Sequence, residues 1–339
     1  MALRRDTLAR HAAARGLLSS APTSAGARGR RGIQAVDFDT GQTYRGATAR
    51  GSCRGSARPK MTEDEIRAGR EAIVAEHGPW GSANIALPYG LFTIDNQPRG
   101  DNHRTLKFLQ IVSDMLDRPL HSLRVIDLAC GEGLYAIEFA RHGAQVLGIE
   151  GRAANFAKAD FARAALELDN LRFVQDDVRA FSAERYGQFD VVLCSGILYH
   201  LDQPACFHFL KAIRAVSTAL CIIDTRIAMQ PEIAVAFEGR TYWGSIYREH
   251  ADTDSPETRL ANLGASLDNP TSFWFTRLSL ANLLTDLGFT SVFDCLAPVP
   301  LNTRADRVTL VARPGRGQRP FNAVAARLDG LRWPDGEQE

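Results

Sequence analysis

The chain has 339 residues, enough for one large domain with additions or for two domains, and 45% of the residues are hydrophobic against 23% charged. This ordinary globular composition excludes collagen-like, coiled-coil and wholly disordered chains. No run approaches the ~18 unbroken apolar residues of a membrane-spanning helix, and the six cysteines are scattered without a C-x-x-C pair, which favours reduced, buried thiols over disulfides or a zinc site.

The first segment, residues 1–60, is rich in Arg, Ala, Gly and Ser and lacks a sustained apolar period, which predicts a disordered leader. It carries eleven arginines and one lysine against three aspartates, so the rest of the chain has a net charge of −8. An acidic folded part argues against a general binder of phosphate backbones, and we expect no nucleic-acid partner. We expect a cytoplasmic protein, or a mitochondrial one if this acid-poor leader is a transit peptide.

Order is predicted to begin at Met61 with an N-terminal helical cap over residues 61–122. Thr62 followed by Glu65 is typical of a capping box, which predicts a helix start. A loop punctuated by Gly and Pro follows over residues 77–102, and a second helix is expected from about Thr105 to Leu116.

From Leu123 onward, apolar strands alternate with segments of helical period, which predicts β-α-β units and a parallel sheet covered on both faces. Strands are expected at 123–129, 144–150, 171–177, 188–195, 218–225, 289–297 and 306–312, and helices at 133–143, 152–168, 204–216 and 277–288. The fold class is therefore α/β, with a Rossmann-like, doubly wound sheet in a domain over residues 123–313.

Two segments depart from this alternation of strands and helices. Residues 226–275 are an insertion dense in aromatic residues amid polar turns, and we expect an aromatic-rich lid there, since long loops in compact domains are often functional. Residues 314–339 are rich in Pro, Gly and Arg and are expected to be a loose tail.

The most informative stretch is VIDLACGEGLYA, residues 125–136, in which a strand leads through a Gly-rich turn into a helix. Gly131 and Gly133 allow close approach of the backbone to a ligand at the helix N-terminus. Glu150, at the end of the next strand, suits hydrogen bonds from ribose hydroxyls. Asp127 inside the strand disfavours a pyrophosphate and favours a ligand that carries an ammonium and a sulfonium. Asp177 ends the third strand and suits an adenine amino group.

These motifs resemble the class I S-adenosylmethionine-dependent methyltransferases of the small-molecule type. The resemblance rests on D-L-A-C-G-E-G at 127–133, G-I-E at 148–150, Q-D-D-V at 175–178 and F-D-V-V-L-C-S-G-I-L-Y-H-L at 189–201. It implies a seven-stranded sheet, mostly parallel with the last strand antiparallel, and S-adenosylmethionine as cofactor. It also implies a set of cofactor-binding residues: Asp127, Gly131 and Gly133 at the methionine end, Glu150 at the ribose, Asp177 with Val178 at the adenine, and Cys194 and Ser195 under the sulfonium. Ala129, Cys130 and Gly151 complete the predicted cofactor-binding set, without a particular part of the cofactor assigned to them.

The catalytic candidates follow the fourth strand. His200 is the best candidate base, because an imidazole transfers protons near neutrality, and Tyr199 beside it is a candidate for shaping the pocket. His250 with Glu249 is a second carboxylate–imidazole possibility. Acceptor contacts are expected from aromatic residues of the loop and the insertion: Trp80, Tyr242, Trp243 and Trp274. We expect no metal site.

The predicted function is methyl transfer to an oxygen or nitrogen of a small-molecule acceptor by in-line displacement. The ILYHL segment also resembles a tRNA wobble-uridine modifying transferase, which would need basic residues around the site. An NAD-dependent oxidoreductase is a further alternative that Asp127 disfavours, and a catalytically silent scaffold with a cofactor pocket is another. The acceptor, the use of a general base and the oligomeric state are left open by the sequence.

Overall fold

The computed structural model describes residues 34–36, 43–45, 61–94, 100–299 and 304–318. The chain divides into two units, Met1–Ala57 and Arg58–Glu339. In the first unit the described residues are two short strands, β1 (Gln34–Val36) and β2 (Thr43–Arg45), which pair antiparallel. The rest of the predicted leader and the tail from residue 319 onward lie outside the described residues.

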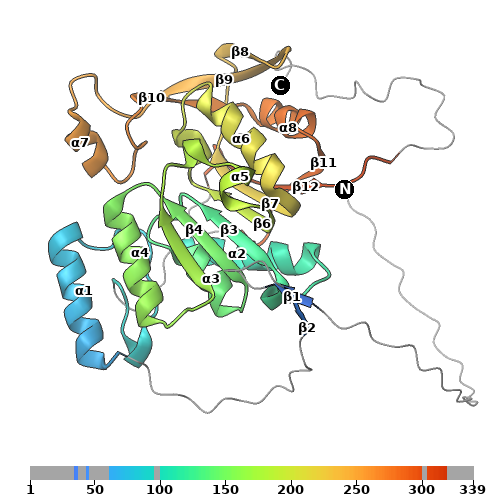
Figure 1. Cartoon of the computed structure of the whole chain (residues 1–339). Coiled ribbons are helices and arrows are strands. Elements are labelled where there is room, and N and C mark those ends of the chain that lie inside the picture. Colours follow the sequence, from blue (N-terminus) through green and yellow to red (C-terminus); the bar gives the residue numbers. More distant parts are fainter. Residues whose placement is uncertain (1–33, 37–42, 46–60, 95–99, 300–303, 319–339) are drawn as a thin grey trace, which may run out of the picture. The chain divides into compact units, whose positions relative to one another are not determined.

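The first predicted helix begins where the sequence predicts. Helix α1 (Glu63–His77) starts at Thr62, whose side chain accepts from the backbone of Glu65 while the Glu65 carboxylate accepts from the backbone of Thr62. The predicted capping box is therefore confirmed. Helix α2 (Gly100–Met115) starts earlier than predicted, and Figure 1 shows α1 beside α4, with which it packs.

The central sheet has seven strands in the order β11-β12-β7-β6-β3-β4-β5. Strand β12 runs antiparallel to both of its neighbours, and the pairs among β7, β6, β3, β4 and β5 are parallel, as the resemblance implies. The strands are β3 (Arg124–Leu128), β4 (Gln145–Glu150), β5 (Leu171–Gln175), β6 (Phe189–Ser195), β7 (Ser217–Arg226), β11 (Phe289–Asp294) and β12 (Arg307–Pro314).

Helices cover both faces of this sheet (Figure 1). Alternate strand residues supply two separate apolar cores: Ile126 packs on the face of α6 and α8, whereas its neighbour Val125 packs on the face of α1 to α4. The helices are α3 (Leu134–Arg141), α4 (Ala153–Ala165), α5 (Ala183–Tyr186), α6 (Ala205–Val216) and α8 (Arg277–Asp286), with short 3-10 turns η1 (Pro88–Gly90), η2 (Leu120–Ser122), η3 (Val178–Ala180) and η4 (Leu198–His200). None of the described helices is long and apolar enough to cross a membrane.

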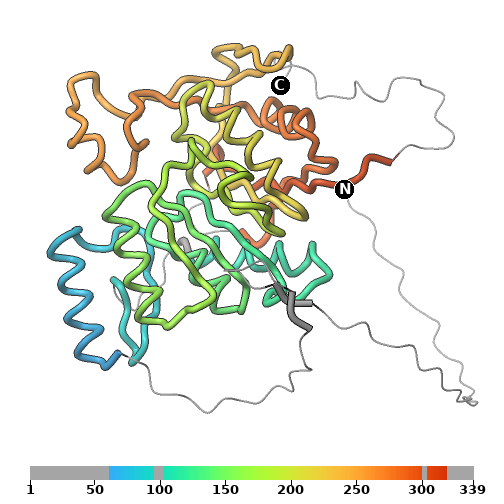
Figure 2. Tube along the Cα trace, in the orientation of Figure 1, coloured from blue at the N-terminus to red at the C-terminus, as the bar shows by residue number. Residues whose placement is uncertain are grey.

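The insertion after β7 is more regular than the sequence predicts. Strands β8 (Ile233–Phe237), β9 (Arg240–Arg248) and β10 (Thr271–Phe275) form an antiparallel sheet in the order β10-β9-β8, with α7 (Pro256–Ala261) between β9 and β10. The continuous tube in Figure 2 traces this excursion and its return into α8. Several of its aromatic side chains pack against Phe207 of α6, so this sheet is attached to the domain through an apolar contact.

Candidate active site

The turn after β3 needs glycine at two points for different reasons. Gly133 precedes α3 with a φ of +86°, and a Cβ there would lie 2.8 Å from the ring of Phe173, so any side chain would clash. Gly131 has a φ of +57°, and a Cβ there would meet nothing within 4 Å. The backbone at Gly131 therefore faces open space, as a ligand cradle requires.

Glu150 is fixed beside this turn by three donors. Its Oε2 accepts from the backbone N–H of Gly131 at 2.8 Å, and its Oε1 accepts from the backbone N–H of Arg152 at 2.9 Å and from Asn155 Nδ2 at 3.4 Å. Burial raises the pKa of Glu150, and these hydrogen bonds oppose that rise. The carboxylate is thus oriented toward the Gly-rich turn before any ligand arrives.

Asp127 lies deeper than its predicted place at the methionine end. It is 1% exposed, and its Oδ2 accepts from the backbone N–H of Ala136 at 3.2 Å in the first turn of α3. Burial raises its pKa to about 8, an effect only partly opposed by that hydrogen bond. Asp127 lines none of the three cavities described below and instead supports the turn from beneath.

Asp177 caps the 3-10 turn after β5 and lies at the other end of the same cleft. Its two oxygens accept from the backbone N–H and from Nε of Arg179, each at 2.8 Å. Burial alone would raise the pKa of Asp177, but the hydrogen bonds and charge of Arg179 outweigh it and lower the pKa. Arg179 in turn binds both oxygens of Asp268, at 2.7 and 3.0 Å, and so joins the cleft to the insertion.

Three adjoining cavities follow the carboxyl edge of the sheet, and His200 borders all of them. The first, of about 210 Å³, is lined by Ala129, Gly131, Glu150, Gly151, Asp177 and Val178 from the predicted cofactor set. The second, of about 270 Å³, is lined by Ala129, Cys130, Gly131, Ser195 and Tyr199 from the predicted residues. The third, of about 460 Å³, is lined by Tyr199 and Trp274 among others.

His200 forms a dyad with Glu249, which follows β9. Nδ1 of His200 lies 3.0 and 2.9 Å from the two oxygens of Glu249. The Glu249 carboxylate also accepts from Ser272 Oγ at 2.7 Å and from the backbone N–H of Ser266 at 2.9 Å. Burial alone would raise the pKa of Glu249, but these partners, His200 foremost, outweigh it and lower the pKa. An ionised Glu249 orients the proton of the imidazole onto Nδ1 and leaves Nε2 as a proton acceptor.

This pairing replaces the predicted alternative of Glu249 with His250. His250 is buried, and its Nε2 lies 3.0 Å from the backbone oxygen of Ser266. The two residues are adjacent on the chain, but their side chains take different partners: Glu249 reaches His200, and His250 reaches the backbone of Ser266. His250 therefore has a structural partner within the insertion.

Of the predicted acceptor contacts, only Trp274 borders these cavities. Its Nε1 donates to the backbone oxygen of Tyr199 at 2.9 Å, and Tyr247 stacks on its ring at a centroid distance of 4.6 Å. Tyr242 is instead a core residue, 1% exposed, whose hydroxyl donates to Asp286 at 2.8 Å. Tyr242 therefore contributes to core packing and not to the predicted acceptor contact.

Trp80 and Trp243 also lie elsewhere. Trp80 is 4% exposed and packs on Phe161 of α4 at a centroid distance of 5.9 Å. Trp243 lies in β9, its backbone N–H donates to Ser279 of α8 at 2.7 Å, and its side chain borders none of the three cavities. Cys194 is likewise fully buried in the core on the α6 face, one residue before Ser195, which does border the second cavity. Alternation along β6 directs the cysteine away from the cleft.

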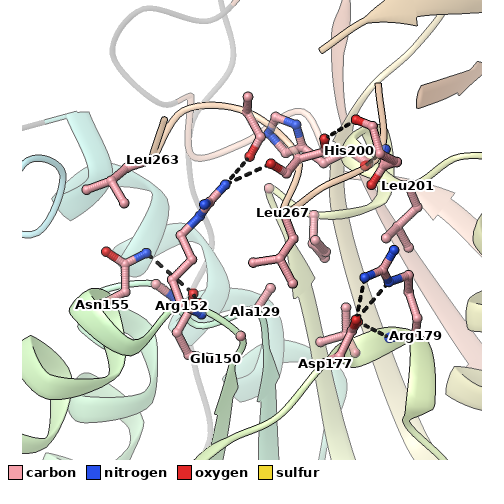
Figure 3. Close-up of a pocket in the computed structure, with 18 of the residues that line it drawn as sticks. Ala129, Glu150, Arg152, Asn155, Asp177, Arg179, His200, Leu201, Leu263 and Leu267 are labelled. Atoms are coloured by element: carbon pink, nitrogen blue, oxygen red, sulfur yellow. Dashed lines mark hydrogen bonds and ion pairs between the residues drawn. The ribbon is translucent and has the colours of Figure 1, made fainter. Parts of the chain in front are cut away.

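The part of the insertion that covers the cleft is the segment 259–269, which we call the lid segment. Arg152 holds it: Nη1 donates to the backbone oxygen of Leu260 at 2.6 Å, and Nη2 donates to the backbone oxygens of Ala265 and Ser266 at 2.9 and 2.8 Å. Figure 3 shows Arg152 rising from beside Glu150 to this segment, with Leu263 and Leu267 above the cleft. Arg152, two residues after the predicted ribose-binding Glu150, thus anchors the lid segment.

Glu132 holds a second wall of the cleft. Its carboxylate accepts from the backbone N–H groups of Gly81, Ser82 and Ala83 at 2.8, 3.0 and 2.8 Å, and Ser82 borders the first two cavities. Lys158, fully buried, lies 3.4 Å from Glu132. Glu132 and Arg152 were missed by the sequence prediction, although a charged residue between two glycines and an arginine directly after G-I-E-G were visible signals.

Within the described part of the chain, no three His, Cys, Asp or Glu side chains are grouped as metal ligands.

Part of the chain is similar to known methyltransferases. Residues 125–218 match a family model described as a methyltransferase domain. A ubiquinone biosynthesis O-methyltransferase of Albidiferax ferrireducens is 34% identical over 100 residues, which cover 30% of this chain and 38% of that protein. The corresponding protein of Psychrobacter cryohalolentis is 34% identical over 108 residues, which cover 30% and 40%. The matches thus span about two fifths of the length of these curated relatives.

Solved structures agree with the fold. The crystal structure of the N-terminal domain of EvdMO1 with SAH bound matches with a TM-score of 0.58 and 23% identity, over 77% of this chain and 100% of that chain. A second structure of that domain, in the presence of SAH and D-fucose, matches with a TM-score of 0.57 and 22% identity, over 75% and 98%.

Proposed function

Because the chain contains a class I S-adenosylmethionine-dependent methyltransferase domain, we propose that it transfers a methyl group to a hydroxyl oxygen of a small-molecule acceptor. The observation that carries the choice of oxygen is the His200–Glu249 dyad at the junction of three cavities. An alcohol or phenol must lose a proton as it is methylated, and a positioned imidazole provides for that loss.

The cleft suits the cofactor at each of its parts. The open backbone at Gly131 leaves room for the ligand, and the Glu150 carboxylate beside it has lone pairs left for ribose hydroxyls. Asp177 and Val178 border the far end, where the adenine would lie. Ser195 and Arg104 border the second cavity, where the methionine end would lie, and Arg104 supplies a cation for its carboxylate. When bound, S-adenosylmethionine supplies an electrophilic methyl group on a positively charged sulfur.

His200 acts through its Nε2 atom. Glu249 keeps the proton of the neutral imidazole on Nδ1, so Nε2 accepts the proton of the acceptor hydroxyl as the oxygen attacks. The imidazolium that forms is stabilised by the adjacent carboxylate. The ring centroids of Tyr199 and His200 are 4.3 Å apart, so Tyr199 shapes the wall that positions the acceptor beside the base.

The lid segment supports the in-line geometry. Arg152 and the Arg179–Asp268 pair hold it over the cleft, a position from which it can limit the access of water and direct the acceptor toward the third cavity. Positioning of this kind lowers the barrier by up to roughly 7–11 kcal/mol.

The test is a turnover assay with S-adenosylmethionine carrying an isotopically labelled methyl group and paired acceptors that carry oxygen or nitrogen at matching positions. Catechol and o-phenylenediamine are one pair, and D-fucose with an amino sugar is another, since the EvdMO1 domain was crystallised with D-fucose. We expect label on oxygen and none on nitrogen, with the transfer lost in His200→Ala. Label on the amine alone, or a rate unchanged in His200→Ala, would contradict the proposal.

A further inference from the structure

The third cavity combines aromatic walls with positive charge. Tyr199, Tyr247 and Trp274 supply its rings, and Arg226 and Arg304 supply two guanidinium groups. The rings are held in place, because Tyr247 stacks on Trp274 and Trp274 donates to the backbone of Tyr199. The cavity is therefore preformed and is suited to a flat or ring-shaped acceptor.

The charge of this lining is positive. Its single carboxylate is Glu249, whose side chain is 1% exposed and which is already bound to His200, Ser272 and Ser266. That negative charge is therefore already engaged by three hydrogen-bond partners within the protein.

The two arginines keep donors available. Arg226 uses Nη1 for an ion pair with Asp306 at 2.6 Å, and its guanidinium carbon lies 5.6 Å from the ring centroid of Trp274 and 5.8 Å from that of Tyr199. Asp306 does not border the cavity. The exposed side chain of Arg304 makes no hydrogen bond or ion pair with any of the residues that the structure describes. A guanidinium has five N–H donors, so most of these ten donors remain for a ligand.

Resting on the proposed function, we propose that the acceptor of this site carries an anionic group, a carboxylate or a phosphate, in addition to its hydroxyl. Arg304 and Arg226 bind the anion at the mouth of the cavity, Tyr247 and Trp274 pack on the body of the acceptor, and the hydroxyl faces His200. Guanidinium groups form paired hydrogen bonds with the oxygens of a planar carboxylate or a tetrahedral phosphate. A cationic acceptor is disfavoured by the same two charges.

The test measures binding to protein saturated with S-adenosylhomocysteine by calorimetry, with two pairs of probes. One pair is 3,4-dihydroxybenzoate and its neutral amide, and the other is D-glucose 6-phosphate and D-glucose, so that the two arms distinguish carboxylate from phosphate. We expect the acid of at least one pair to bind at least about tenfold more tightly than its neutral partner, as for a charge-assisted hydrogen-bonded pair. Arg304→Ala removes most of this preference, and Arg226→Gln reduces it further.

The control is Arg248→Ala, an exposed arginine of the same small sheet that pairs with Asp252 and does not border the cavity. It leaves the preference for the acid unchanged. The proposal is overturned if binding is equal within both pairs, if the neutral partners bind more tightly, or if neither acid binds. It is also overturned if the preference for the acid survives in the double variant Arg304→Ala with Arg226→Gln. Binding of S-adenosylhomocysteine in the same samples shows separately that the cofactor site is intact, so failure here is distinct from failure of the proposed function.

Discussion

His200 and Glu249 are 49 residues apart in the chain, yet Nδ1 of His200 lies 2.9 Å from Oε2 of Glu249. The histidine follows the fourth parallel strand of the central sheet, and the glutamate follows β9 of the insertion. The proposed base is therefore assembled from two parts of the fold, and its orientation depends on how the insertion is held.

This relationship predicts that Glu249→Gln lowers kcat. The amide retains the size of the carboxylate but carries no charge to stabilise the imidazolium. His200→Ala removes the base and should lower kcat by about 10²–10⁴-fold, with Glu249→Gln within or just below that range. Steady-state kinetics measure this effect, with cofactor affinity unchanged. Glu232→Gln, an exposed glutamate of the same insertion, is the control and should retain wild-type rates.

A second prediction concerns the lid segment. Arg152→Met removes hydrogen bonds to four backbone oxygens, those of Arg259, Leu260, Ala265 and Ser266. The three shorter ones are each worth about 1.5 kcal/mol or more with a charged donor, so the cover over the cleft loosens. We expect affinity for S-adenosylhomocysteine to fall at least about tenfold and proteolysis within residues 259–269 to accelerate. Arg163→Met, a part-exposed arginine of α4 that pairs with Asp160, should change neither. An Arg152→Met protein with wild-type affinity would show that the lid segment needs no such anchor.

A third prediction concerns the buried ion pair of Glu132 and Lys158, whose side chains are 3% and 0% exposed. Glu132→Gln leaves Lys158 charged and without its carboxylate, which should cost about 3–5 kcal/mol of unfolding free energy. The double variant Glu132→Gln with Lys158→Met removes the stranded charge and should recover part of the loss. Chemical denaturation measures both, and a double variant less stable than the single one would contradict this account.

A fourth prediction concerns pH. The pKa of Asp127 is about 8 in the folded protein against an ordinary value of 3.8. Between these values the folded chain holds a proton that the unfolded chain has lost, so this group makes stability decrease as pH rises from about 4 to about 8. Asp127→Asn keeps an acceptor for the N–H of Ala136 and removes this dependence. The Tm of Asp127→Asn minus the Tm of the wild type should therefore increase from about pH 4 to about pH 8. Calorimetry at a series of pH values measures this difference, and a difference that stays constant would contradict the prediction.

The sequence predicts the scaffold well because its signals are local. Apolar strands separated by helical periods give the sheet, and the bend around Gly131 with Glu150 one unit later gives the ligand cradle. Each of these signals lies within a single β-α-β unit, where order along the chain determines position in space.

The rest depends on contacts between distant segments. Whether Tyr242 faces a ligand or Phe207 depends on the register of β9 against its neighbours, which no local pattern gives. The pairing of His200 with Glu249 rather than of His250 with Glu249 has the same origin. Aromatic density in an insertion therefore predicts burial as readily as recognition.

The most direct test of the central claim is calorimetric titration of the full chain with S-adenosylhomocysteine and, separately, with NAD. The account predicts that S-adenosylhomocysteine binds, that Glu150→Ala weakens it at least about tenfold through lost hydrogen bonds from the ribose to a charged acceptor, and that NAD gives no heat of binding. Binding of NAD without binding of S-adenosylhomocysteine, or an affinity unchanged in Glu150→Ala, would contradict it.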